Sequence, residues 1–348
     1  MTLPQTYFAA LVLTILSMLC WGSWANTFKM TGNWRFELFY FDYSLGVLIA
    51  AAIAAFTFGT MGSDGFQFLD DLLQTGKRNI FYGFLGGAVF NLANMLLVAA
   101  ISVAGMAVAF PVGIGMALVI GVIWSYFLKP EGNPVLLFGG AAIIVGAIIV
   151  DSLAYKAHAA ARLEQQAKAG MLKTSAPRVS PKGIILSLVS GLLMGSFFPL
   201  VEIGKAWGSG LGPYAIGFVF AFGVFASTFV FNLFFMNLPV QGEPVEMLDY
   251  IRKGSLKKHL LGLAGGMIWY SGAISNFVAA SAEQSAKVGP AVSYAIGQGA
   301  TMVSALWGLF LWKEFAGADY RVKSLLYVMM ALFVVGLGMV SLAPLYTR

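Results

Sequence analysis

The stretch LCWGSWAN, residues 19–26, completes an apolar run of about 20 residues, which is the length that a helix needs to cross a hydrocarbon layer roughly 30 Å thick. Trp21 and Trp24 lie three residues apart and Asn26 follows, so one helix would hold two indole rings and an amide at membrane depth. An amide buried without a partner costs roughly 2 to 7 kcal/mol. We therefore expect Asn26 to face protein, water or a ligand.

Two interpretations of this stretch stay open from the sequence. In the first, the rings and the amide line a cavity that receives a solute. In the second, Asn26 bonds a neighbouring helix, while Trp21 and Trp24 are packing residues or anchors at the membrane interface.

The composition indicates an integral membrane protein. Of 348 residues, 59% are hydrophobic and only 10% are charged, whereas soluble domains carry roughly 25% charged residues. Cys20 is the only cysteine and His158 and His259 are the only histidines. A His/Cys metal centre or a Ser-His-Asp triad therefore has almost nothing to be built from, so neither an enzyme nor a cofactor is expected.

Hydropathy predicts ten membrane spans. They cover residues 7–27, 37–59, 80–102, 105–128, 135–155, 183–206, 214–236, 259–281, 289–312 and 324–343. The first span is expected to be retained rather than cleaved as a signal peptide, because residues 1–9 contain no Lys or Arg and the apolar run exceeds the usual length.

The polar segment 156–182 separates two halves of five spans, residues 1–155 and 183–348, which resemble each other. The matching positions are Gly83 and Gly87 with Gly262 and Gly266, Pro111 with Pro290, Trp124 and Glu131 with Trp307 and Glu314, Gly22 and Ser23 with Gly195 and Ser196, and Gly46 with Gly217. An odd number of spans per copy inserts the copies in opposite directions. The sequence therefore predicts an all-α membrane protein of ten helices, built as two inverted five-helix repeats around a central cavity.

The basic residues predict an orientation. The termini and the even-numbered loops hold 6 of the 21 Lys and Arg residues, and the odd-numbered loops, including segment 156–182, hold the other 15. Because Lys and Arg collect on the cytoplasmic side, we expect both termini outside and segment 156–182 in the cytoplasm, in a bacterial inner membrane. The basic residues behind the net charge of +6 are therefore interpreted as orienting the chain in a bilayer, and not as a nucleic-acid-binding surface.

The few polar and indole side chains within the spans are the candidate substrate-binding residues. They are Trp21, Trp24, Asn26, Asn91, Asn94, Trp269, Tyr270, Asn276, Tyr294 and Gln298. Amides and hydroxyls from several spans favour a neutral solute that gives and accepts hydrogen bonds, and the rings favour a flat heterocycle or the C–H face of a sugar. The alternative is that the amides bond one another and hold the helices together.

Two carboxylates are candidates for proton coupling, because a buried acid can exchange a proton near neutral pH. Glu202 follows Pro199, and Lys205 three residues later makes a local ion pair the alternative. Asp42 lies in the aromatic stretch FYFDY, residues 39–43. Asp151, Glu283 and Lys287 are further ionisable groups near the spans, ranked below these two.

Several motifs resemble one transporter family in order and spacing. They are WGSW at 21–24, FDYS at 41–44, Gly86 and Gly87 followed by NLAN at 91–94, SFFP at 196–199 and WGLFLWKE at 307–314. On these residues the chain resembles the ureide permeases of the drug/metabolite transporter superfamily and, more distantly, the bacterial glucose/ribose uptake and rhamnose-symport families. It departs from the plant members in lacking their phosphate-loop-like central segment and in placing Glu202 where an amide is expected.

The resemblance implies a ten-helix, proton-linked carrier for ureides or nucleobases such as allantoin or uracil. Its expected partners are a small-molecule substrate, protons and the lipid bilayer. Monosaccharide uptake is the alternative substrate class. A membrane receptor or scaffold that binds without transporting is the alternative function.

Overall fold

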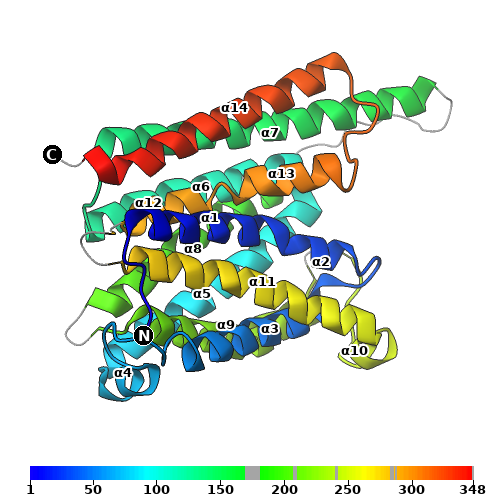
Figure 1. The fold of residues 1–348 in the computed structure, drawn as a ribbon. Helices are drawn as coiled ribbons and strands as arrows, with labels where there is room; N and C mark the ends of the chain where they lie inside the picture. Colours follow the sequence, from blue (N-terminus) through cyan, green and yellow to red (C-terminus); the bar gives the residue numbers. More distant parts are fainter. Residues whose placement is uncertain (169–180, 207–209, 240–241, 283–285, 287, 347–348) are drawn as a thin grey trace.

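The computed structural model describes residues 1–348 except 169–180, 207–209, 240–241, 283–285, 287 and 347–348, and it is built from helices (Figure 1). The first half contains α1 (Tyr7–Ser23), α2 (Ala25–Lys29), α3 (Phe36–Phe56), α4 (Phe68–Gln74), α5 (Lys77–Ala104), α6 (Met106–Leu128) and α7 (Pro134–Lys168). The second contains α8 (Pro181–Ala206), α9 (Pro213–Asn237), α10 (Asp249–Arg252), α11 (Leu256–Ala280), α12 (Pro290–Gly297), α13 (Ala300–Phe310), α14 (Tyr320–Leu342) and the 3-10 helix η2 (Ala343–Tyr346).

In the described part of the chain, 8 helical stretches are long and apolar enough to cross a membrane. This confirms the all-α membrane class, and the ten-helix arrangement is compatible with it. The eighth predicted span corresponds to α11, a 25-residue helix whose small and polar residues are buried against other helices. The ninth is interrupted, because α12 ends at Gly297 and α13 begins at Ala300.

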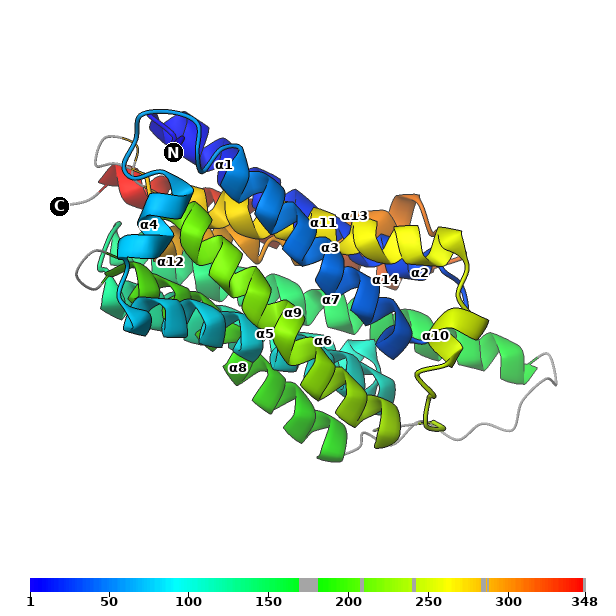
Figure 2. The same ribbon diagram turned by 90° about the horizontal axis from the view of Figure 1, so that it is seen from below.

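The long helices run between two ends of the molecule (Figures 1 and 2). Both chain termini and α4 lie at one end, which we name the terminus end. The last turns of α7, together with α2 and α10, lie at the opposite end, which we name the central-loop end because segment 156–182 connects α7 and α8 there. The expectation that both termini share one side agrees with this arrangement.

The packing pairs are related by exchange of the two halves. Helix α5 packs on α8, and α11 packs on α1. Helix α6 packs on α8, and α12 and α13 pack on α1. Helix α3 packs on α11, and α9 packs on α5. The pairs of α3 with α9 and of α7 with α14 are unchanged by the exchange. Two related halves predict this pattern, and the boundaries at 155 and 183 stay a prediction.

Glycines allow the closest of these approaches and fix their register. A Cβ atom at Gly46 would lie 2.2 Å from the carbonyl oxygen of Leu263, and one at Gly223 would lie 2.3 Å from that of Phe84. Both distances are far below van der Waals contact, so only glycine fits. The contacts therefore relate Gly46 to Gly223 rather than to Gly217, the partner that the sequence suggested.

The two prolines that the sequence paired also differ in position. Pro111 lies inside α6, whereas Pro290 is the first residue of α12. A proline at the first helical position replaces an N–H that would have no intrahelical partner, so it does not interrupt the helix. The interruption in this span lies farther along, at Gln298 and Gly299.

Candidate functional site

A cavity of about 160 Å³ lies between the two halves. A cavity of roughly 150 Å³ accommodates one benzene ring, so this space has the size of a small ring compound. The first half contributes Trp21, Gly22, Trp24, Ala25, Phe90, Asn94, Leu97, Phe110 and Ile114. The second half contributes Met194, Phe197, Trp269, Gln298, Ala300, Thr301 and Ser304. None of these lining residues is charged, and a neutral occupant matches such a wall because an unpaired charge would be costly there.

Aromatic rings form one wall of this cavity. The rings of Phe90 and Trp269 stack with centroids 4.2 Å apart and an interplanar angle of 27°. Trp21 lies nearly parallel to Trp269 at 6.0 Å and 17°. The Trp21 ring is held by two glycines, since a Cβ atom would come within 2.8 Å of it at Gly272 and within 2.6 Å at Gly297. The wall is therefore set by backbone positions on two other elements.

The polar groups of the cavity come mainly from the interruption between α12 and α13. Gln298 lies in the interruption, and Thr301 and Ser304 follow on α13. No hydrogen bond of the Gln298 side chain is found within the described residues, so its amide is available to an occupant of the cavity. Asn94 donates from Nδ2 to the hydroxyl of Tyr40 at 3.1 Å, which leaves its carbonyl oxygen as an acceptor.

Five predicted residues are thus brought together at this cavity, namely Trp21, Trp24, Asn94, Trp269 and Gln298. The other five lie outside its lining. Asn26 accepts a hydrogen bond from Nε1 of Trp312 at 2.6 Å and donates to the Ser23 carbonyl at 2.8 Å. Asn91 donates to Ser227 at 2.7 Å and to Thr228 at 3.2 Å, so it joins α5 to α9.

Asn276 and Tyr294 hold the helices that surround the interruption. Asn276 donates to Ser17 on α1 at 3.1 Å and to the Ser293 carbonyl on α12 at 3.0 Å. The Tyr294 hydroxyl lies 3.3 Å from the carbonyl oxygens of Ala117 and Met194. Tyr270 is buried, and its hydroxyl oxygen would lie 2.6 Å from a Cβ atom placed at Gly217.

The two candidate carboxylates are far apart in the fold. Glu202 pairs with Lys205 at 2.7 Å, and the side chains are 7% and 11% exposed. The local ion pair that the sequence allowed is therefore present. Both residues border a separate cavity of about 730 Å³ at the terminus end. Glu283 and Lys287 lie outside the described residues.

Asp42 binds two residues that the sequence did not indicate. Its Oδ2 lies 2.8 Å from Nδ1 of His259, and its Oδ1 accepts a hydrogen bond from the Tyr250 hydroxyl. Burial, followed by the bond to Asp42, raises the pKa of Tyr250 above its ordinary value, so the phenol keeps its proton and donates. These partners are 217 and 208 residues away in the chain, which no local pattern bridges.

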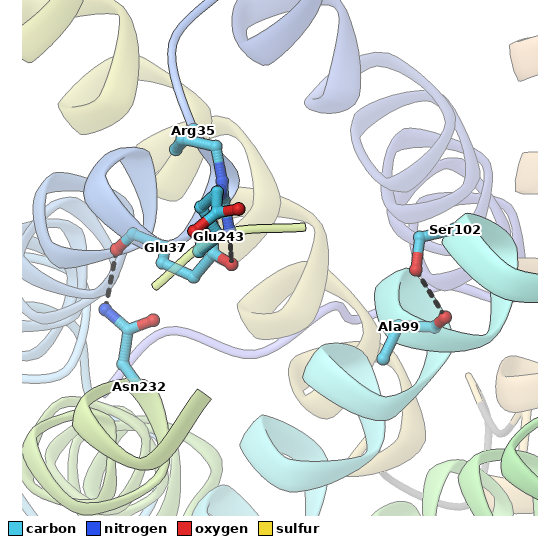
Figure 3. Close-up of polar contacts among 6 residues, drawn as sticks. All are labelled: Arg35, Glu37, Ala99, Ser102, Asn232 and Glu243. Atoms are coloured by element: carbon cyan, nitrogen blue, oxygen red, sulfur yellow. Dashed lines mark hydrogen bonds and ion pairs between the residues drawn. The ribbon is translucent and has the colours of Figure 1, made fainter. Parts of the chain in front are cut away.

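A further cavity of about 190 Å³ lies near the central-loop end, between α3, α5 and α9. Figure 3 shows its polar contacts. Arg35 pairs with Glu37 at 2.7 Å and donates to the Glu243 carbonyl at 3.0 Å, and Asn232 donates to the Glu37 carbonyl at 2.6 Å. Ser102 on the facing helix bonds only its own backbone, through the Ala99 carbonyl at 2.7 Å. The charged groups on one side are therefore bound among themselves.

Comparison with known proteins finds one family to which this chain is similar. The family model described as "Ureide permease" matches residues 39–185. Ureide permease 1 of Arabidopsis thaliana is 24% identical, with 94% of this chain and 95% of that protein covered. Ureide permease 2 of the same plant is 23% identical, with 94% of each chain covered. This chain is ureide permease-like.

The ureide permease likeness covers both walls of the cavity. The model match at 39–185 includes Asn94 and Phe90, and the similarity to ureide permease 1 covers 94% of the chain. Probable ureide permease A3 of Vigna unguiculata is 31% identical over a shorter part, 32% of this chain and 31% of that protein. The likeness to the sugar-uptake families stays a prediction.

A solved structure titled only "Crystal structure of protein" has a similar fold to this ureide permease-like chain. Its TM-score is 0.62, with 98% of this chain and 100% of that one covered. The sequences are 17% identical, so the likeness concerns the fold alone.

Proposed function

We propose that this protein is a secondary active transporter of small neutral polar compounds, with ureides such as allantoin as the principal class and nucleobases such as uracil as related substrates. The observation that supports this most is the uncharged cavity between the halves, with indole rings on one wall and amides on the other. Substrate sites of secondary transporters form at such interfaces, beside interrupted helices. The family likeness supports the ureide class.

The proposed chemistry of recognition follows from the lining side chains. A ureide is rich in N–H donors and carbonyl acceptors, and the amides of Asn94 and Gln298 offer both kinds of partner. Trp21, Trp24 and Trp269 supply ring faces against a flat substrate. Asn26, Asn91, Tyr270, Asn276 and Tyr294 contribute by holding the surrounding helices in position.

The proposed proton site is Asp42, with Glu202 second. Asp42 joins the two halves, because it is on α3 and its partner His259 is on α11. The pair therefore places a carboxylate and an imidazole, two proton-binding groups, at a contact between the halves. Glu202 instead keeps a local partner, Lys205, on its own helix.

Uptake into proteoliposomes tests the substrate and the coupling together. Labelled allantoin, uracil, glucose and rhamnose are supplied under an imposed proton gradient. We expect gradient-driven accumulation of allantoin or uracil. Accumulation of a sugar alone would transfer the proposal to monosaccharide uptake, and binding without accumulation of any solute would indicate a receptor or scaffold.

The pH profile of uptake separates the two carboxylates. We expect Asp42→Asn and His259→Gln to flatten the dependence of uptake on external pH, because each removes one partner of the pair. Glu202→Gln is the matched comparison and should leave the profile in place. The opposite outcome, a flat profile only in Glu202→Gln, would assign coupling to Glu202.

The proposed setting is a bacterial cytoplasmic membrane, with both termini outside and segment 156–182 in the cytoplasm. The distribution of Lys and Arg among the loops supports this orientation. A reporter fused after Arg348 that is active only in the cytoplasm would reverse it and would leave the transport proposal intact.

A further inference from the structure

Two seams between helices leave the central cavity in opposite directions. The first is the contact of α1 and α2 with α13, and the second is the contact of α8 with α6. Both start at a glycine. A Cβ atom at Gly22 would lie 2.5 Å from the Ala300 carbonyl oxygen, and one at Gly195 would lie 2.8 Å from the Ala117 carbonyl oxygen.

The two starting contacts are equivalent in register. Gly22 also meets Cβ of Val303 at 2.5 Å, three residues beyond Ala300, and Gly195 meets Cβ of Ile120 at 2.7 Å, three residues beyond Ala117. The same shift along the chain carries Trp124 to Trp307 and Glu131 to Glu314. The glycine register likewise carries Ser23 to Ser196, so Ser23, Trp307 and Glu314 of the first seam have counterparts in Ser196, Trp124 and Glu131 of the second.

The first seam is closed by successive side-chain bonds toward the central-loop end. Trp307 donates from Nε1 to the Ser23 hydroxyl at 2.8 Å, one step beyond the cavity. Trp312 then donates to Asn26 at 2.6 Å. Lys29 and Glu314 form an ion pair at the end of the seam.

Further contacts hold that ion pair in place. The ammonium of Lys29 lies 4.5 Å from the ring centroid of Trp312. The other oxygen of Glu314 accepts a hydrogen bond from the Tyr155 hydroxyl at 2.8 Å, which ties the pair to α7. The pair is partly exposed, with side chains at 42% and 33%, so water and a competing charge can reach it.

The second seam has the counterpart residues in a different arrangement. Ser196, the counterpart of Ser23, donates to the Leu192 carbonyl of its own helix at 2.6 Å. The shift that relates Ser23 to Ser196 places Glu202 at the position of Lys29, and Lys205, one turn farther along α8, pairs with this Glu202 at 2.7 Å. Glu131 pairs with Lys129 at 3.7 Å. Lys129 on one side and Glu202 and Lys205 on the other border the 730 Å³ cavity.

We propose that Lys29 and Glu314 form a gate that holds the central-loop end shut in this conformation, and that Lys205 and Glu131 form the matching gate of the terminus end in the opposite conformation. Lys205 exchanges Glu202 for Glu131 when the second seam closes, while the Lys29–Glu314 pair and the two tryptophan bonds separate. This inference rests on the proposed transport function, because it assigns the charged groups that alternate as the cavity opens to each side.

Cysteine labelling tests the gates without any substrate. The reporter is Ser304→Cys in the cavity, on a Cys20→Ser background that removes the only native cysteine. Vesicles of both orientations are treated with a membrane-impermeant maleimide. We expect the parent to label faster from the terminus end. Lys29→Gln and Glu314→Gln should each raise labelling from the central-loop end about two- to fivefold, the range that a partly exposed ion pair contributes.

Matched variants make the result specific. The exchanged pair Lys29→Glu with Glu314→Lys should return labelling from the central-loop end to the parent rate. Glu131→Gln, which weakens the gate of the opposite conformation, should lower that labelling. Lys323→Gln removes an exposed charge of α14 and should change nothing. The proposed gate would be overturned if the cavity cysteine labelled from the central-loop end at the same rate in the parent and in both single variants, with unchanged thermal stability. Since labelling needs no transported solute, a shift in labelling without uptake of any tested substrate would leave the gate in place and remove the proposed function.

Discussion

Helix α6 and the α12–α13 pair occupy corresponding positions in the two halves, and only the second is interrupted. In α6 the sequence GIG, residues 113–115, runs through a continuous helix, whereas GQG, residues 297–299, marks the end of α12 and the start of α13. Both Ile114 and Gln298 line the cavity. Helix α6 therefore provides an apolar surface, whereas the interrupted element provides polar groups.

The difference shows how a nearly symmetric scaffold binds an asymmetric solute. Phe110 and Ile114 face the cavity from α6, while Gln298, Thr301 and Ser304 face it from the interrupted element. An interrupted helix exposes polar groups that a continuous helix bonds internally. Hydrogen-bond recognition should therefore be concentrated in the second half.

The largest effect is expected from filling the space beside the interruption. Gly297→Ala would bring Cβ within 2.6 Å of the Trp21 ring, which also packs closely on Gly272. Overpacking of this kind costs about 1 to 3 kcal/mol, so allantoin uptake should fall at least about fivefold. The matched variant is Gly113→Ala, whose Cβ would meet only the flexible end of Leu97 at 2.8 Å. Equal losses in the two variants would contradict the comparison.

An intermediate effect is expected from the amide itself. Gln298→Ala should raise the KM for allantoin about tenfold, because a hydrogen bond to an otherwise unpaired substrate group is worth about 1 to 2 kcal/mol. Ile114→Ala at the corresponding position should change KM about twofold or less. The measurement is initial uptake rate against concentration, with protein thermal stability as the control. If Ile114→Ala had the larger effect on KM, recognition would belong to the first half.

The smallest effect is expected one turn beyond the interruption. Thr301→Val keeps the shape of the side chain and removes its hydroxyl, so KM should rise about threefold. Thr228→Val is a suitable control, because Thr228 bonds Asn91 away from the cavity at 3.2 Å. The control should lower thermal stability and leave KM near the parent value. A KM change confined to Thr228→Val would show that the cavity polar groups do not contact the substrate.

Sequence reasoning identified the residues of the cavity better than their arrangement. Trp21, Trp24, Asn94, Trp269 and Gln298 were expected and lie together, because rings and unpaired amides are unusual enough in apolar spans to be recognised individually. Thr301 and Ser304 were missed, since a hydroxyl in a membrane helix commonly bonds its own backbone and carries little signal.

The partners of the remaining polar residues were decided by packing. Asn91 and Asn94 are one turn apart on α5, yet Asn91 bonds α9 and Asn94 borders the cavity. Which face of a helix meets a neighbour depends on the glycine contacts between helices, as in the approach of Gly46 to Leu263. Those contacts join residues that are far apart in the chain.

The sequence by itself determined the membrane class, the long apolar helices and the family likeness, because these follow from composition and from spacing within one segment. The tertiary structure decided that Asp42 meets His259, that Lys29 meets Glu314 while Lys205 keeps Glu202, and which amides face the cavity. The physical reason is that ion pairs and cavities are formed between helices, so their geometry depends on how the two halves pack and not on the order of residues within either half.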